Sequence, residues 1–272
     1  MVTGLTTLWA SEEGTANMRV VVVGSAGRMG SAVCEAVAAD NDLNLVAAVD
    51  PTCSGEKDPT DSLVVLDSLE HVDPADVDVA VDFTVAEAAR LNIQWCANNG
   101  VHAVVGTSGL GESDIASFRS AFTSSNCLIA PNFAIGAVLL MRFAEIAAPF
   151  FPTAEVIELH HDNKVDAPSG TAMRTLERMA QASSDWGNDP TEQEIIPGSR
   201  GGTGPGGISV HSVRLRGLVA HQEVLFGTDG ETLTLRHDSL DRGSFMNGIT
   251  LACRVISEHP GVTVGLDTYL GI

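Results

Sequence analysis

The chain has 272 residues, of which 44% are hydrophobic and 27 are glycine, so it is long enough for two buried cores and has the composition of a globular α/β protein. Its formal net charge is −20, and no cluster of lysine and arginine is present to neutralise phosphates, which excludes nucleic acid as an expected partner. The 5 cysteines are widely spaced and form no Cys-x-x-Cys pair, which is typical of a reduced, cytoplasmic protein.

Two segments bear on targeting and on membranes. Residues 1–17 lack both a basic start and a long apolar core, so we do not expect a signal peptide there. We expect instead a mobile tail that precedes Met18 and the first strand. The apolar run 134–151 contains Arg142 and Glu145, so it predicts a buried helix and no membrane span.

A strand–turn–helix–strand unit follows the tail. In the run 19–23 every residue after Arg19 is a β-branched valine, which is typical of a strand buried on both faces of a parallel sheet. After a glycine-rich turn, the pattern predicts a helix over 31–40 and a strand over 43–49 that ends at Asp50. The alternation then continues with strands over 77–83, 102–105 and 127–130 and helices over 85–98 and 112–124. This order predicts a Rossmann-type, doubly wound parallel sheet.

The pattern changes after Phe151. A strand over 155–160 and a helix over 171–182 precede a loop rich in glycine, proline and acidic residues over 183–207, and three strands follow over 208–216, 218–226 and 231–237. We expect a second α+β domain with a mixed, mostly antiparallel sheet. A helix over 245–257 and a strand over 262–268 are expected to return to the first domain. The predicted domains are 18–131 with 241–272, and 132–240.

Glycines 24, 27 and 30 open the first helix with the spacing Gly-x-x-Gly-x-x-Gly. A dinucleotide needs this arrangement, because its pyrophosphate approaches the backbone closely and binds the amides of a helix N-terminus. Asp50 ends the second strand twenty residues later, where a carboxylate can accept hydrogen bonds from ribose hydroxyls. The alternative is a structural glycine turn beside a strand-end acid. The strand–turn–helix context favours the cofactor.

The choice between NADH and NADPH depends on the residues around Asp50. Its carboxylate would repel a 2′-phosphate, and Pro51 cannot bind one, so the sequence favours NADH. Arg28 lies in the glycine turn and could accept the phosphate, which leaves NADPH open.

Three more turns follow strands of the first domain, at 83–84, 106–109 and 130–133. Ligands of such sheets bind at the carboxyl ends of the strands, so these turns are candidates for the same crevice. Each of them could also be an ordinary loop.

The segment 158–172 reads Glu-Leu-His-His-Asp-Asn-Lys-Val-Asp-Ala-Pro-Ser-Gly-Thr-Ala and includes one of only two lysines in the chain. Imidazoles and an ammonium can transfer protons, and a Ser-Gly-Thr turn that opens a helix can hold a carboxylate. Taken singly, these residues could be strand histidines, a solvated charge and a helix N-cap. We predict no metal site, because adjacent strand residues face opposite ways and a second ligand cluster is absent.

These motifs together resemble the family of 4-hydroxy-tetrahydrodipicolinate reductase, also called dihydrodipicolinate reductase. The resemblance extends from Met18 nearly to the end of the chain. It is carried by the segments 24–30, 104–109, 130–136, 158–172 and 217–227, of which the His-His-x-x-Lys-x-Asp-Ala-Pro-Ser-Gly-Thr motif is the most specific.

The resemblance implies a nicotinamide-dependent reduction of a cyclic dicarboxylate in the diaminopimelate route to lysine, by a homotetramer built through the sheet of the second domain. It implies that His160 donates and accepts a proton and that Lys164 donates one. The residues implied for substrate binding are His161, Ser169, Gly170 and Thr171. Those implied for the cofactor are Gly24, Ser25, Ala26, Gly27, Arg28, Met29, Asp50, Gly106, Thr107, Ser108, Ala130, Pro131, Asn132 and Phe133.

The chain departs from the commoner family pattern at Gln222, where many members have a histidine, and at Ser108, where threonine is usual. Two alternatives stand beside the family. One is another two-domain reductase, such as an aspartate or homoserine dehydrogenase, which the His-His-x-x-Lys motif disfavours. The other is a redox-sensing binding protein, which would need a partner-binding element such as a basic DNA-reading helix, and the acidic sequence shows none.

Overall fold

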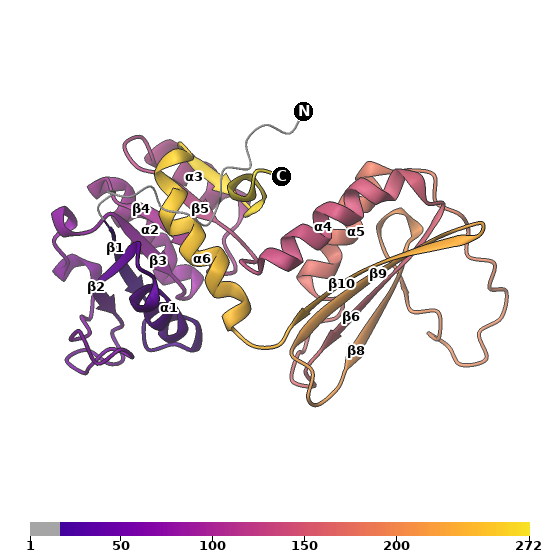
Figure 1. Cartoon of the computed structure of the whole chain (residues 1–272), viewed down its shortest axis with the longest axis horizontal. Coiled ribbons are helices and arrows are strands. Elements are labelled where there is room, and N and C mark those ends of the chain that lie inside the picture. Colours follow the sequence, from indigo (N-terminus) through magenta and orange to yellow (C-terminus); the bar gives the residue numbers. More distant parts are fainter. Residues whose placement is uncertain (1–16) are drawn as a thin grey trace. The chain divides into compact units, whose positions relative to one another are not determined.

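The computed structural model describes residues 17–272. The tail predicted for residues 1–17 therefore lies, apart from Asn17, outside the described residues. The described chain divides into two compact units, one of residues 17–133 with Phe245–Ile272 and the other of Ala134–Ser244 (Figure 1).

The first unit contains a six-stranded sheet in the order β11-β5-β4-β3-β1-β2, and every pairing in it is parallel. The chain forms β1 and β2 first and then returns to the other side of β1 with β3, so the strand order reverses between β1 and β3. The strands are β1 (Met18–Val23), β2 (Leu43–Val49), β3 (Val79–Asp82), β4 (His102–Val105), β5 (Cys127–Ile129) and β11 (Val262–Val264).

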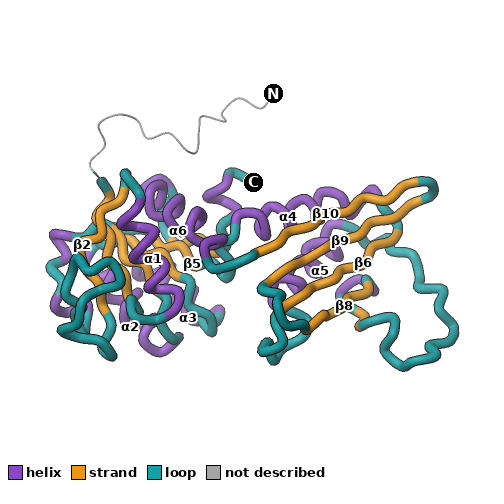
Figure 2. The backbone as a smooth tube through the Cα atoms, turned by 60° about the horizontal axis from the view of Figure 1, so that its bottom comes forward, coloured by secondary structure: helices purple, strands orange, loops and turns teal. Residues whose placement is uncertain are grey.

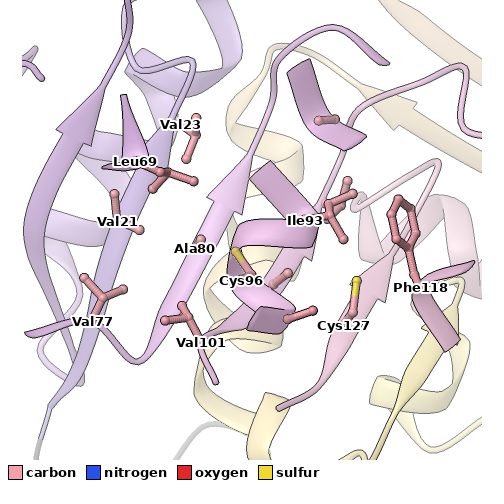
Figure 3. Close-up of a cluster of buried hydrophobic side chains, with 14 of the residues drawn as sticks. Val21, Val23, Leu69, Val77, Ala80, Ile93, Cys96, Val101, Phe118 and Cys127 are labelled. Carbon is pink, nitrogen blue, oxygen red and sulfur yellow. The ribbon is translucent and has the colours of Figure 1, made fainter. Parts of the chain in front are cut away.

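Helices cover both faces of this sheet, as the uninterrupted apolar strands require. One face carries α2 (Ala86–Asn99) and α3 (Glu112–Ala121), whose Ile93, Cys96 and Phe118 pack against the sheet in the cluster shown in Figure 3. Helix α1 (Arg28–Ala39) contributes nothing to that cluster and contacts β1 and β2. Helix α6 (Gly243–Val255) leads to β11, which completes the sheet beside β5.

The second unit contains a five-stranded sheet in the order β10-β9-β6-β8-β7. Strands β6 and β8 pair in parallel and the other pairings are antiparallel, which confirms the expected mixed sheet. The strands are β6 (Thr153–His160), β7 (Gly202–Thr203), β8 (Ser209–Arg214), β9 (Ala220–Thr228) and β10 (Glu231–Ser239).

Helices α4 (Ile135–Ala147) and α5 (Gly170–Ala182) cover one face of this second sheet (Figure 2). Leu140, Leu176 and Met179 of the helices pack there against Val156 and Phe226 of the strands. Because side chains alternate along a strand, the neighbours Ile157, Leu159 and Leu225 lie on the opposite face, which neither helix covers. We call this opposite side the open face.

Several element ends differ from the expectations. The helix expected over 134–151 ends at Ala147, because Pro149 in the following 3₁₀ turn Ala148–Phe150 cannot donate a backbone hydrogen bond. The last strand ends at Val264 instead of residue 268, because the next residue, Gly265, takes a positive φ of 93°. The short strand β7 lies inside the segment predicted to be a loop. In residues 17–272, no helix combines the length and the apolar character needed to cross a membrane.

Close packing at Gly248 provides a test of the first unit. A Cβ there would lie 2.0 Å from the Phe133 carbonyl oxygen, so the backbone would have to move. Gly248→Ala gains about 1 kcal/mol of helix propensity, but overpacking costs up to about 3 kcal/mol. We therefore expect a lower midpoint of thermal unfolding. Gly202→Ala is the control, since its Cβ would meet no atom closer than 3.6 Å. An equal or higher midpoint for Gly248→Ala would contradict this packing.

Candidate functional site

The glycine turn between β1 and α1 is shaped by the absence of side chains. Gly24 has a φ of 81°, and the N–H of Gly27 donates to its carbonyl at 3.0 Å. A Cβ on Gly30 would lie only 2.0 Å from the Gly24 carbonyl oxygen, so α1 can pack this closely on the turn only with glycine there. The helix begins at Arg28 with Gly27 as a cap that offers no side chain to its amides. These amides can therefore serve a phosphate.

Asp50 lies beside this turn and is only 8% exposed. One carboxylate oxygen accepts a hydrogen bond from the Ala26 N–H at 3.1 Å, and the other accepts from the backbone and hydroxyl of Thr52 at 2.9 and 2.6 Å. Burial acts to raise the pKa of Asp50, but the hydrogen bonds from Thr52 and Ala26 outweigh burial and lower it. The structure thus brings an ionised carboxylate to the glycine turn.

Asp82 connects the ends of β3 and β4, a role that sequence reasoning missed. It is 3% exposed, and one oxygen accepts from the hydroxyls of Thr84 and Thr107 at 2.8 and 2.7 Å. The other oxygen accepts from the Asn92 amide on α2 at 2.7 Å. The side chain of Thr107, a predicted cofactor residue, is therefore held by a hydrogen bond to a buried carboxylate.

The remaining cofactor candidates differ in their placement. Phe83 fills the space over Gly106, where a Cβ would lie 2.1 Å from its ring, and its ring centroid is 6.0 Å from that of Phe133. Gly24 in turn packs on the Phe83 carbonyl. The turns after β1, β3, β4 and β5 are thereby in contact. Ser25, Ala130 and Phe133 are buried, whereas Ala26, Gly27, Arg28, Ser108 and Pro131 are exposed and Met29, Gly106 and Asn132 are half-buried.

In the second unit, the last residues of β6 carry the predicted proton-transfer site. The His160 Nδ1 lies 2.5 Å from Oε2 of Glu158, whose side chain has no solvent exposure. Arg214 on β8 donates to both Glu158 oxygens at 2.8 Å. Burial alone would raise the pKa of Glu158, but the hydrogen bonds from Arg214, Ser212 and His160 lower it overall. Glu158 is therefore an ionised carboxylate inside the protein.

His160 itself is 15% exposed. Burial lowers the pKa of His160, Glu158 acts in the opposite direction, and the positive charges of Lys164 and Arg214 lower it further, with a net shift downward. Lys164 lies close enough to act on His160 electrostatically, and its ammonium bonds both oxygens of Asp166 at 2.8 and 2.9 Å.

The predicted substrate residues surround the start of α5. Ser169 is buried and caps the helix, since its hydroxyl accepts the Ala172 N–H at 3.2 Å while its own N–H donates to Glu158. Gly170 is open, because a Cβ there would meet nothing within 4 Å. Thr171 is half-buried and His161 is exposed. A carboxylate can therefore approach this helix start from solvent.

The unusual Gln222 lies behind this helix. Its amide nitrogen donates to the Thr175 hydroxyl at 2.7 Å in the buried layer between β9 and α5. Within the described residues, no group of three or more histidine, cysteine, aspartate or glutamate side chains could hold a metal ion.

Comparisons with known proteins place both parts of the chain in one family. Residues 18–133 match the model of the N-terminal part of dihydrodipicolinate reductase, and residues 136–270 match that of its C-terminal part. The 4-hydroxy-tetrahydrodipicolinate reductase of Nocardia farcinica is 49% identical over 262 residues, covering 94% of this chain and 99% of the relative. The same-named protein of Streptomyces coelicolor is 45% identical over 260 residues, covering 94% and 98%.

Solved structures show the same similarity. The dipicolinate-bound dihydrodipicolinate reductase of Paenisporosarcina sp. TG-14 superposes with a TM-score of 0.83 at 37% identity, covering 93% of this chain and 99% of that one. Aspartate semialdehyde dehydrogenase II of Vibrio cholerae, at 14% identity and a TM-score of 0.52 over 89% and 99% of the two chains, shares only the fold.

The burial of His160 leads to a prediction about the pKa of its ring. Because burial disfavours the charged imidazolium, the ring should lose its proton at a pH below the ordinary value of about 6.5. We expect an NMR titration of the His160 ring in the ligand-free protein to give such a lowered pKa. A pKa at or above the ordinary value would show that the ion pair with Glu158 outweighs burial.

Proposed function

Because the chain belongs to the dihydrodipicolinate reductase family, we propose that it is an oxidoreductase that reduces 4-hydroxy-tetrahydrodipicolinate to tetrahydrodipicolinate with NADH or NADPH, in the diaminopimelate route to lysine. The observation that carries this proposal is the grouping of His160, Lys164 and the open start of α5 at one end of β6. This grouping joins two proton donors to a carboxylate-binding helix end.

The first unit fits a dinucleotide. The cradle between β1 and α1 depends on the positive φ of Gly24 and on the close approach of Gly30 to the Gly24 carbonyl, and the amides that start α1 are available for a pyrophosphate. Asp50 would accept the ribose hydroxyls, and its negative charge favours NADH over NADPH. The turns 106–108 and 130–133 would line the rest of the site. When bound, the reduced nicotinamide supplies a hydride to the substrate ring.

The second unit supplies the proton. Once the substrate has lost its hydroxyl group as water, a hydride that reaches the ring carbon then conjugated to the imine would push an electron pair toward the ring nitrogen, and the resulting enamine needs a proton. Nδ1 of His160 is held by Glu158, which leaves Nε2 to donate, and Lys164 is a second donor. Overall the reaction consumes one hydride and one proton, and the substrate loses its hydroxyl group as water.

Substrate binding depends on local positive charge and on backbone amides, because a net charge of −20 repels a dianion at long range. We assign one carboxylate of the substrate to the start of α5, with Ser169, Gly170 and Thr171, and to the exposed ring of His161. Lys164 adds a cation that acts electrostatically on His160.

The open face of the second sheet suits self-association. Ile157, Leu159, Val213 and Leu225 lie on it and neither α4 nor α5 covers them, so a second copy of the chain could bury these apolar side chains. The proposal therefore includes a homotetramer formed through this face and a cytoplasmic location, both testable by sedimentation and by cell fractionation.

The proposed activity is tested by following NADH and NADPH oxidation in parallel, with substrate generated freshly from pyruvate and aspartate semialdehyde. Rapid oxidation that depends on this substrate is expected. Tight cofactor binding without turnover would overturn the reductase and favour a redox-sensing protein. Turnover of aspartate or homoserine instead would assign the chain to another dehydrogenase class.

His160→Gln removes a proton donor and leaves the dinucleotide cradle untouched. We expect kcat to fall by roughly 100-fold or more, with the Kd for NADH unchanged within about twofold. His211→Gln is the matched control, because His211 also bonds a glutamate, at 2.6 Å, but lies on the open face, away from the predicted site. Since the open face is the proposed tetramer interface, sedimentation must show that His211→Gln keeps the assembly of the original protein. A loss of NADH affinity as large as the loss of kcat would remove the proposed role of His160.

Asp50→Ala should weaken the binding of NADH more than the binding of NADPH. The carboxylate is expected to accept hydrogen bonds from the ribose hydroxyls of NADH and to repel the 2′-phosphate of NADPH. The two Kd values are measured by quenching of protein fluorescence. Asp67→Ala removes the same charge from an exposed site in the same unit and serves as the control. An unchanged ratio of the two Kd values in Asp50→Ala would show that Asp50 makes no such contact.

A further inference from the structure

Glu158 joins three segments of the second unit, β6, β8 and the start of α5. Its fully buried carboxylate accepts hydrogen bonds from the guanidinium of Arg214 on β8, from the N–H of Ser169 at the start of α5, and from His160 at the end of its own strand. Ser212 also bonds it. One side chain thus contacts the residues on both sides of the loop 161–168, which contains Lys164.

The ionised state of Glu158 fixes the proton on the His160 ring. An ionised carboxylate can only accept hydrogen bonds, so the His160 nitrogen that lies 2.5 Å away must be the protonated one. In neutral His160, Nδ1 therefore carries the proton and Nε2 carries the lone pair. In the charged ring, Nε2 carries the transferable proton. The direction of proton transfer is set by Glu158, which itself touches no solvent.

Arg214 connects Glu158 with the loop 161–168, which contains Lys164. Besides its two bonds to Glu158, the guanidinium donates to the backbone carbonyls of Val213 at 2.8 Å and Asp166 at 2.6 Å. Asp166 is the residue whose carboxylate holds the Lys164 ammonium. The planar guanidinium thus connects the carboxylate that orients His160 with the backbone that positions Lys164.

We propose that Glu158 and Arg214 are positioning residues, a buried ion pair that fixes the tautomer of His160 and places Lys164 beside it. The inference rests on the proposed reductase function, which supplies the roles of His160 and Lys164. A buried ion pair is in general no more stabilising than an apolar pair of the same size. Stability alone therefore gives no reason to place this charge pair next to the proton donors.

A second pair on the same strand provides the comparison. Glu155 on β6 also bonds an arginine and a histidine, Arg200 at 2.7 Å and His211 at 2.6 Å, but it is 34% exposed and lies on the open face. It has the chemistry of Glu158 without the contact to the predicted site. Glu155→Gln is therefore the matched control for Glu158→Gln, and because the open face is also the proposed tetramer interface, sedimentation must show that this variant keeps the assembly of the original protein.

Glu158→Gln is the first test. We expect kcat to fall roughly 100-fold, as for loss of a positioned proton donor, while the Kd for NADH and the kcat of Glu155→Gln stay within about twofold of the original protein. The charged groups that act on His160 are Glu158, Lys164 and Arg214. Loss of the only negative one destabilises the imidazolium, so the alkaline limb of kcat/KM should move to lower pH.

Arg214→Lys is the second test, because Glu158→Gln leaves a cation unpaired and could fail to fold. Lysine keeps the charge and the ionised Glu158 but cannot bridge to the Asp166 carbonyl with a planar fork. We expect kcat to fall about tenfold, with the alkaline limb of kcat/KM close to its original pH. Arg200→Lys is the control. If folded Arg214→Lys and folded Glu158→Gln both keep the kcat and the pH profile of the original protein, the positioning role is overturned.

An NMR measurement separates this inference from the proposed function. Nitrogen shifts of the His160 ring in the original protein should show the Nδ1-protonated tautomer, and Glu158→Gln should reduce its population. If the original protein turns over no substrate, the proposed function fails while the tautomer is still tested. An Nε2-protonated ring in the original protein would overturn the inference even with full activity.

Discussion

A charged group that solvent cannot reach needs hydrogen-bond partners inside the protein, and the buried Glu158 imposes this constraint on the second unit. The carboxylate is completely buried, so β8 must bring Arg214 to it and α5 must begin where the Ser169 N–H can reach it. The two partners lie 56 and 11 residues away along the chain. Parallel pairing of β6 with β8 achieves this, because it sets His160 beside Arg214 on the helix-covered face.

The first unit depends on a different constraint, which is how closely its segments pack on one another. Gly30, Gly106 and Gly248 each occupy a position where one added carbon would lie about 2 Å from its neighbour. Their packing brings the turns after four parallel strands into contact, and Asp82 fixes two of those turns with side-chain hydrogen bonds. Small residues and one buried acid thus hold together the turns that are proposed to bind a dinucleotide.

The sequence was a good guide wherever structure depends on neighbours along the chain. The valine-rich run 19–23, the glycine turn and Asp50 predicted the first strand, its helix and the parallel sheet from local patterns alone. The ends of helices and strands were less accurate, because Pro149 and Gly265 act within elements whose apolar pattern continues past them. The two-residue strand β7 has too short a pattern to recognise.

The partners of the candidate site could not be predicted. Glu158 stood in the most informative segment, yet nothing local to it points to Arg214, and only the sheet register joins the two. Asp82 likewise resembles an ordinary strand-end acid until Thr107 and Asn92 are seen around it. His160, Lys164 and the helix start at Gly170 could be predicted as one site because they lie within a span of eleven residues.

The return of the chain to the first unit has a consequence for its synthesis. Strand β11 pairs with β5, and the Gly261 N–H and the Asn126 side chain bond each other at 3.0 Å next to this pairing. On the ribosome, every residue of the second unit emerges before these partners of β5 do. The growing chain therefore carries β5 with one edge unpaired while about half of its residues are added, and that edge is open to chaperones and to other chains during this interval.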